Sequence, residues 1–160
     1  ELVPLDLPGV SEVDVWLSEN ESGCFCPDCL GQNAFVMETR GITRAFEKAR
    51  TGRPRATLRL LLTQASYASN DQVLAAVRPD TKVIYYDGGR TYDSSHRPMI
   101  SPRLAEYARG RWLGVYPQLT SSWRTVFPFS GPQFIQARML EFATKGLAAM
   151  IGYATPSNRY

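Results

Sequence analysis

A glutamate and three cysteines, all residue types that carry chemistry, lie close together near the start of the chain. The segment Val13–Asn20 reads V-D-V-W-L-S-E-N, and E-S-G-C-F-C-P-D-C follows it directly. Valine and tryptophan favour a strand, which would end at Glu19. In parallel α/β folds, reactive side chains gather at the carboxyl ends of strands. We therefore predict that this segment forms part of an active-site rim, with the cysteines shaping the adjacent loop.

Glu19 is the candidate general acid. A carboxylic acid that protonates a glycosidic oxygen must be partly desolvated so that its pKa rises. We expect the apolar wall to come from Trp16, Leu17 and Phe25. A base or nucleophile is also needed, unless the acetamido group of the substrate serves; Asp87 is the candidate, with Glu21 as the other option. The competing interpretation of Glu19 is an ordinary surface or capping carboxylate.

Cys24, Cys26 and Cys29 form a C-x-C-x-x-C pattern and are the only cysteines of the chain. Thiolates at this spacing can hold three corners of a tetrahedral zinc site, and we expect such a zinc to be structural. The fourth ligand would be His96, the only histidine, or Asp28. The alternatives are free cysteines that pack the loop, or one disulfide and one thiol. Cysteine usage therefore leaves the cellular compartment open.

Apolar runs and helical patterns alternate along the whole chain. The runs are mostly continuous, as in strands that are buried on both faces of a parallel sheet. The expected strands are Val13–Leu17, Thr57–Thr63, Lys82–Tyr86, Trp112–Tyr116 and Ala149–Tyr153. The expected helices are Asn33–Arg50, Asn70–Val77, Arg103–Arg109 after a Ser101-Pro102 start, and a last helix opened by Ser130-Gly131-Pro132-Gln133. The last helix should bury Ile135, Met139, Phe142 and Ala143.

This order predicts one α/β domain over residues 1–160, with five parallel strands joined by long crossovers. Two architectures fit: the C-terminal portion of a TIM-type (β/α)8 barrel, which we favour, and an open doubly wound sheet. A complete barrel needs about 250 residues. In a complete barrel, strands one to three would lie upstream of this sequence, and the sequence leaves open whether they exist. A partial barrel leaves open sheet edges, which two copies of the chain are expected to cover as a homo-oligomer.

Polar and aromatic residues follow every expected strand. Hydroxyl groups of sugars accept and donate hydrogen bonds, and the apolar faces of sugar rings stack on aromatic side chains. This pattern favours a carbohydrate as the binding partner, although loops are polar in any protein. The candidate substrate-binding residues are Trp16, Asn20, Tyr86, Arg90, Tyr116, Gln118, Trp123 and Arg124.

Composition argues against several other classes. The net charge is only +3 and Lys and Arg are dispersed, which argues against nucleic acid as a partner. No apolar run is long enough to span a bilayer, so no membrane partner is expected. The glycine pair at residues 88–89 lacks the spacing of a dinucleotide-binding loop. A single histidine in a Ser-rich stretch makes a Ser-His-Asp triad unconvincing.

The motif V-W-L-S-E-N-x-x-x-C-x-C-x-x-C, followed by a helix and a strand, resembles bacterial glycoside-hydrolase-like barrel domains of unknown function. These domains are distantly similar to family 20 hexosaminidases and α-glucuronidases. The resemblance covers nearly the whole chain, as strands four to eight of the barrel. It implies that Glu19 is the acid/base and that Tyr116 matches a tyrosine of strand seven. Ser18 stands where the hexosaminidases have an aspartate, which argues against substrate-assisted catalysis on an N-acetyl sugar.

Two kinds of function follow from these observations. The first is hydrolysis of a glycosidic bond with Glu19 as the general acid. The alternative is a non-catalytic partial barrel or carbohydrate-binding module that self-associates and carries a structural metal at the cysteine loop. A doubly wound domain that binds a small ligand at its strand ends is a third interpretation.

Overall fold

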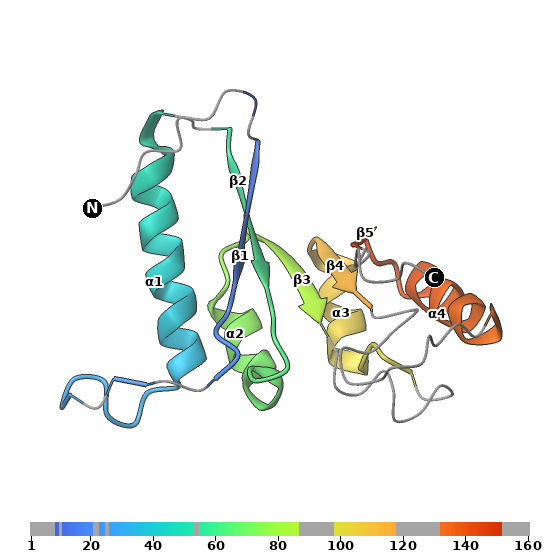
Figure 1. Cartoon of the computed structure of the whole chain (residues 1–160), viewed down its shortest axis with the longest axis horizontal. Helices are drawn as coiled ribbons and strands as arrows, with labels where there is room; N and C mark the ends of the chain where they lie inside the picture. The colour runs from blue at the N-terminus through green and yellow to red at the C-terminus, as the bar shows by residue number, and fades with distance from the viewer. Residues whose placement is uncertain are drawn as a thin grey trace, which may run out of the picture. The chain divides into compact units, whose positions relative to one another are not determined.

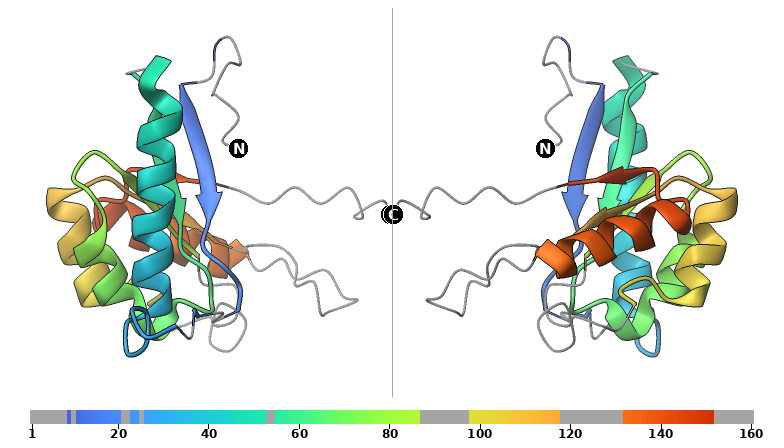
Figure 2. Two further views of the ribbon diagram at one scale, coloured as in Figure 1. Left: turned by 90° about the vertical axis from the view of Figure 1, so that its left-hand side faces the viewer. Right: turned by 90° about the vertical axis from the view of Figure 1, so that its right-hand side faces the viewer.

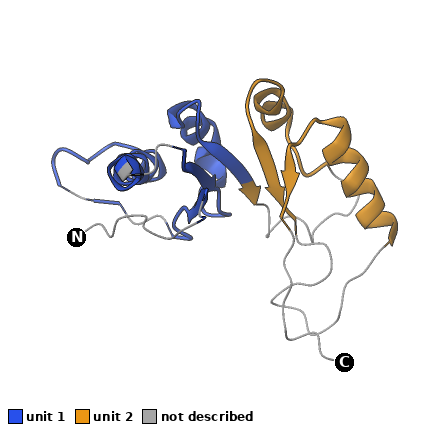
Figure 3. Ribbon diagram, turned by 90° about the horizontal axis from the view of Figure 1, so that it is seen from above, with its two compact units in different colours: residues 1–84 blue, residues 85–160 orange. Residues whose placement is uncertain are grey.

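A computed structural model describes residues 9, 11–20, 23–24, 26–52, 55–86, 98–117 and 132–151. Strands and helices alternate along the chain, so the expected α/β class is confirmed. The five strands belong to one sheet in the order β1-β2-β3-β4-β5, and the described pairings β1–β2, β2–β3 and β4–β5 are parallel. The chain divides into two compact units, residues 1–84 and 85–160 (Figure 3).

The first unit holds β1 (Glu12–Trp16), β2 (Thr57–Leu61) and most of β3 (Lys82–Tyr86). Helix α1 (Ala34–Ala49) links β1 to β2, with the short 3-10 turn η1 (Arg50–Gly52) behind it. A second turn, η2 (Tyr67–Ser69), leads into α2 (Asn70–Ala76), which precedes β3. In Figure 1, α1 runs alongside β1 and β2 over their whole length.

Helix α1 packs on the sheet through an apolar stripe. Phe46 and Ile42 lie against Leu58 of β2 and against Val13 and Val15 of β1. The side views show α1 covering one face of these two strands (Figure 2). Helix α2 packs against α1, so both helices lie over the same part of the unit.

The other face of β1 and β2 carries charges. Register places Asp14 opposite Arg59, and Arg59 opposite Lys82 of β3. The Arg59 guanidinium bonds Asp14 Oδ2 at 2.7 Å and lies 3.1 Å from Glu12 Oε2, while Lys82 also bonds Glu12. The expectation of doubly buried strands is therefore wrong for β1, where Asp14 and Trp16 are exposed. It is confirmed for β4, whose four residues are all buried.

The second unit holds α3 (Pro102–Gly110), β4 (Leu113–Tyr116), α4 (Pro132–Thr144) and β5 (Ala149–Met150). Ser101 caps α3 by accepting a hydrogen bond from the Leu104 amide, with Pro102 at the first helical position, as its sequence predicts. Gly146 follows α4 with a φ of +72°, a left-handed conformation that favours glycine, and turns the chain toward β5.

The buried face of α4 differs from the one expected. Phe142 is buried as predicted, but Phe134 and Arg138 are buried with it, whereas Ile135 and Met139 are half-buried and Ala143 is exposed. The physical reason is Glu141, which lies 2.6 Å from the Arg138 guanidinium and makes burial of that charge acceptable. An apolar pattern alone does not reveal a buried ion pair, so the predicted stripe was rotated by one position.

Candidate metal centre and strand-end rim

The three cysteines lie in the loop between β1 and α1. Their Sγ atoms all lie within 4.8 Å of one another. Cys24 and Cys26 are exposed and Cys29 is half-buried. A tetrahedral ion with bonds of about 2.3 Å separates its sulfur ligands by about 3.8 Å. The triad therefore needs only a small contraction to hold one metal ion, as the C-x-C-x-x-C spacing predicts.

Backbone hydrogen bonds shape the loop around the second and third cysteines. The amides of Cys29 and Leu30 both donate to the Cys26 carbonyl at 3.0 Å, which folds the chain into a tight turn. The Gln32 amide donates to the Cys29 carbonyl at 3.0 Å, and its side chain donates to the Asp28 carbonyl at 2.6 Å. Gly31, with a φ of +81°, permits the reversal that follows. The turn thus presents the sulfurs on one short segment.

Hydrogen bonds among the three cysteines shift the pKa values of two of their thiols. Hydrogen bonds from Cys24 and then Cys29 lower the pKa of Cys26, because they stabilise its thiolate. Hydrogen bonds with Cys26 and then Cys24 raise the pKa of Cys29 to about 11. Cys26 therefore loses its proton more readily than Cys29. A divalent cation is the group that would allow all three sulfurs to be thiolates at neutral pH.

The two ends of the loop are anchored to the rest of the first unit. At its start, the Ser18 amide and hydroxyl donate to Glu38 Oε1 of α1 at 3.0 and 2.7 Å. The Ser18 carbonyl accepts from the buried Thr63 hydroxyl at 2.9 Å. At its end, Asn33 caps α1 by accepting from the amides of Phe35 and Val36.

A second polar network supports the carboxyl end of β2. The Asn33 side chain donates to Ser69 Oγ at 2.8 Å. Buried Ser66 bonds the Thr63 carbonyl at 3.0 Å and the Asn70 side chain at 2.9 Å. Together with the bond from Thr63 to Ser18, these hydrogen bonds connect the segments that follow β1 and β2 with the start of α1.

Glu19 is the first residue after this anchored Ser18. Its side chain is exposed, whereas the sequence led us to expect a partly desolvated carboxyl group. Leu17 points inward and is buried, and Trp16 remains 41 % exposed. Asn20 is exposed beside Glu19. Phe25, the third residue of the apolar wall expected around Glu19, lies outside the described residues.

In the second unit, two of the predicted aromatic residues come together. The rings of Tyr86 and Tyr116 lie with their centroids 5.3 Å apart at an angle of 59°. Both residues end their strands, β3 and β4, at the carboxyl side where a parallel sheet carries its sites. The other predicted site residues lie outside the described residues: Asp87, Arg90, His96, Gln118, Trp123 and Arg124.

The sequence did not reveal the residues that hold the rim. Glu38 and Thr63 fix Ser18, yet neither residue belongs to a recognisable motif. Thr63 lies two residues after the end of β2, and a hydroxyl at that position is a weak signal for a rim contact. Glu38 lies twenty positions after Ser18, in the second turn of α1, and only the packing of that helix brings the two together.

Comparisons with known proteins give no relationship for this chain. No family model matches it. No curated protein and no solved structure matches it. Within the described part of the chain, no helix combines the length and the apolar composition that a membrane crossing requires. The functional argument therefore depends on the geometry of the chain itself.

Proposed function

We propose that this chain is an α/β domain that binds a thiophilic metal ion, with zinc as the natural occupant, through Cys24, Cys26 and Cys29. The convergence of three sulfur atoms within 4.8 Å is the observation that carries this proposal. The ion has a structural role: it closes the loop whose two ends are anchored by Ser18 and Asn33. His96 as the fourth ligand is a prediction from the sequence.

Metal analysis of the purified protein tests this proposal. We expect one zinc ion per chain in the wild type and little or none in Cys26→Ser, because two sulfur ligands hold zinc poorly. Leu30→Ser is the matched control, since Leu30 lies in the same loop with 72 % of its surface exposed. Equal zinc contents in the wild type and Cys26→Ser would rule out the triad as the metal site.

Hydrolysis of a glycosidic bond is the second candidate function, and the position of Glu19 favours it. An exposed carboxyl group follows a backbone segment that Glu38 and Thr63 hold in place, at the carboxyl end of a parallel strand. A sugar bound over this group would remove it from solvent, which is the desolvation that a general acid needs. We retain Asp87 as the proposed base or nucleophile and a carbohydrate as the proposed partner, both from the sequence.

Turnover of aryl glycosides tests this second function. If Glu19 is the general acid, Glu19→Gln lowers kcat by roughly a hundredfold or more. Glu106→Gln serves as the control, because Glu106 is an exposed carboxylate on α3. An unchanged rate in Glu19→Gln, with activity present in the wild type, excludes Glu19 as the acid.

The strand order supports a singly wound arrangement, the C-terminal portion of a (β/α)8 barrel. A doubly wound sheet reverses its strand order at a switch point, and the order β1-β2-β3-β4-β5 contains no reversal. Right-handed crossovers between successive neighbours place their helices on one face of the sheet. The packing of α1 against α2 in the first unit agrees with this arrangement.

A further inference from the structure

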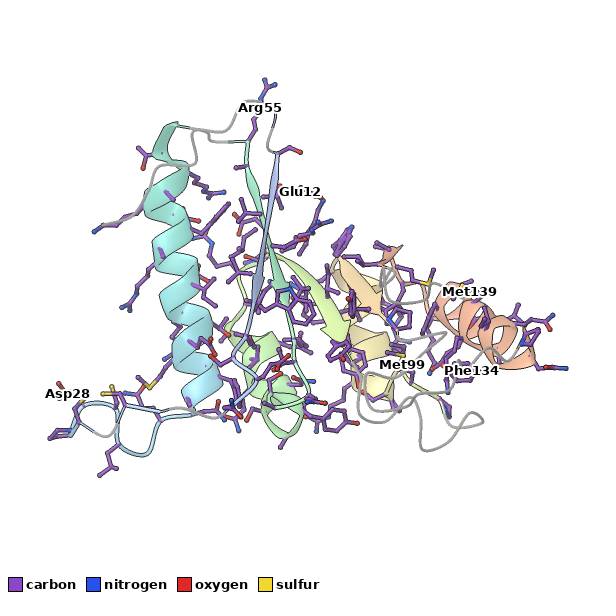
Figure 4. The ribbon with its side chains drawn as sticks, viewed as in Figure 1. Glu12, Asp28, Arg55, Met99, Phe134 and Met139 are labelled. Atoms are coloured by element: carbon purple, nitrogen blue, oxygen red, sulfur yellow. The ribbon has the colours of Figure 1, made fainter. Side chains whose placement is uncertain are left out.

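The proposed metal ion has three sulfur ligands from one short segment, and a tetrahedral ion needs a fourth. Among the described residues, no other Cys, His, Asp or Glu joins the group. Asp28 lies between two of the cysteines in sequence but does not belong to it. Figure 4 shows Asp28 at the outer end of the loop, away from β1 and α1.

Most of the described residues of the cysteine loop are exposed. Cys24 and Cys26 are exposed, as are Pro27 and Asp28 between the second and third cysteines. The loop projects from the end of the unit opposite to Glu12 (Figure 4). An ion held here therefore has a side that is not covered by the described part of the chain, which is the arrangement of an open metal site rather than a closed one.

Charge determines which donor fits the open side. A divalent ion on three thiolates keeps one net negative charge. Residues 11–39 contain no Lys, Arg or His, while Glu19, Glu21 and Asp28 flank the cysteines. No cation in this segment offsets the charge of an anionic fourth ligand, so a neutral nitrogen or oxygen donor is favoured.

We infer that the metal ion at Cys24, Cys26 and Cys29 has an open fourth position that takes a neutral external donor of the imidazole or water type. This inference rests on the proposed metal binding. It identifies the class of ligand that the site accepts: an uncharged nitrogen or oxygen base from solution.

Cobalt(II) substitution of the full chain tests the inference, because the visible absorption of tetrahedral cobalt changes with each ligand. We expect imidazole to shift the cobalt bands in a saturable manner. Pyridine-3-carboxamide and pyridine-3-carboxylate are a matched neutral and anionic pair with the same ring donor. We expect the carboxylate to bind roughly three- to fivefold more weakly, from repulsion by the complex and its acidic flanks.

His96→Ala is the decisive variant. If the fourth position is open, its cobalt spectrum and its affinity for imidazole match those of the wild type. Cobalt bands that no external donor alters would overturn the inference while leaving the metal site itself intact, and a changed spectrum in His96→Ala would then identify the histidine as the ligand. Equal or tighter binding of the carboxylate overturns the charge argument. Absence of sulfur-to-cobalt absorption overturns the inference together with the metal site.

Discussion

At the scale of single residues, the contact between Ser18 and Glu38 fixes the backbone that precedes the candidate acid Glu19. The Glu38 carboxylate accepts from both the amide and the hydroxyl of Ser18, and both residues are half-buried. We expect Glu38→Ala to lower the free energy of unfolding by about 1–3 kcal/mol, because it leaves the Ser18 donors without their acceptor. Chemical denaturation measures this, with Arg44→Ala on the exposed side of α1 as the control. Equal effects of the two substitutions would contradict the anchoring role.

The sequence was informative about residues whose role depends on near neighbours. The cysteine cluster, the caps Asn33 and Ser101, and the placement of Glu19 after β1 all follow from spacing over a few positions. The partner of Ser18 was not predictable, because Glu38 reaches it only after α1 has packed on the sheet. The exposure of Glu19 was missed for a similar reason, since burial depends on side chains that the local pattern does not place.

At the scale of elements, the local periodicity located the strands and helices well. Strand β3 has the bounds that the sequence predicted, and α1 differs only by its capping residues, because apolar spacing and capping are short-range signals. The orientation of α4 was not predictable. Arg138 turns inward because Glu141 neutralises it, and Glu141 in turn accepts from the amides of Met99 and Ile100, more than forty positions away. Figure 4 labels Met99, whose amide donates to Glu141, and Phe134, a buried residue of α4.

Glu141 makes the second unit sensitive to acid. Burial opposes ionisation of Glu141, which is only 11 % exposed, but hydrogen bonds from Lys145, the amides of Ile100 and Met99, and Arg138 outweigh it and lower its pKa. A pKa that is lower in the folded chain contributes stability above the unfolded value of about 4.3 and loses it as the pH falls through the folded value.

We therefore expect Glu141→Gln to lower the free energy of unfolding by about 1–3 kcal/mol at pH 7. The difference from the wild type should shrink below about pH 4, where the wild-type carboxylate becomes protonated. Thermal denaturation between pH 3 and pH 7 measures this, with Glu106→Gln as a control whose difference from the wild type stays flat. A difference for Glu141→Gln that does not depend on pH would show that packing, rather than charge, holds this contact.

At the scale of the whole molecule, the sheet begins with β1 and ends with β5. In the described part of the chain, the outer side of β1 pairs with no other strand. An edge of this kind favours pairing with a second copy. We expect light scattering to show an average mass that rises from monomer toward dimer with concentration.

A charge on this edge strand should suppress that association. Trp16→Lys places a lysine on β1, where 41 % of the tryptophan is exposed, and we expect it to stay monomeric. Leu140→Lys is the matched control, because Leu140 is 59 % exposed but lies on α4 rather than on a strand. If Leu140→Lys abolishes association and Trp16→Lys does not, the contact does not involve β1.

The placement of the cysteines allows this loop to be labelled selectively with thiol reagents. All three sulfhydryl groups of the chain lie between residues 24 and 29, and no cysteine occurs elsewhere in its sequence. A maleimide dye or an alkylating reagent therefore reports on one surface turn at the end of β1 and on nothing else. Protection of these groups from modification reads out ion occupancy directly, without any substitution in the chain.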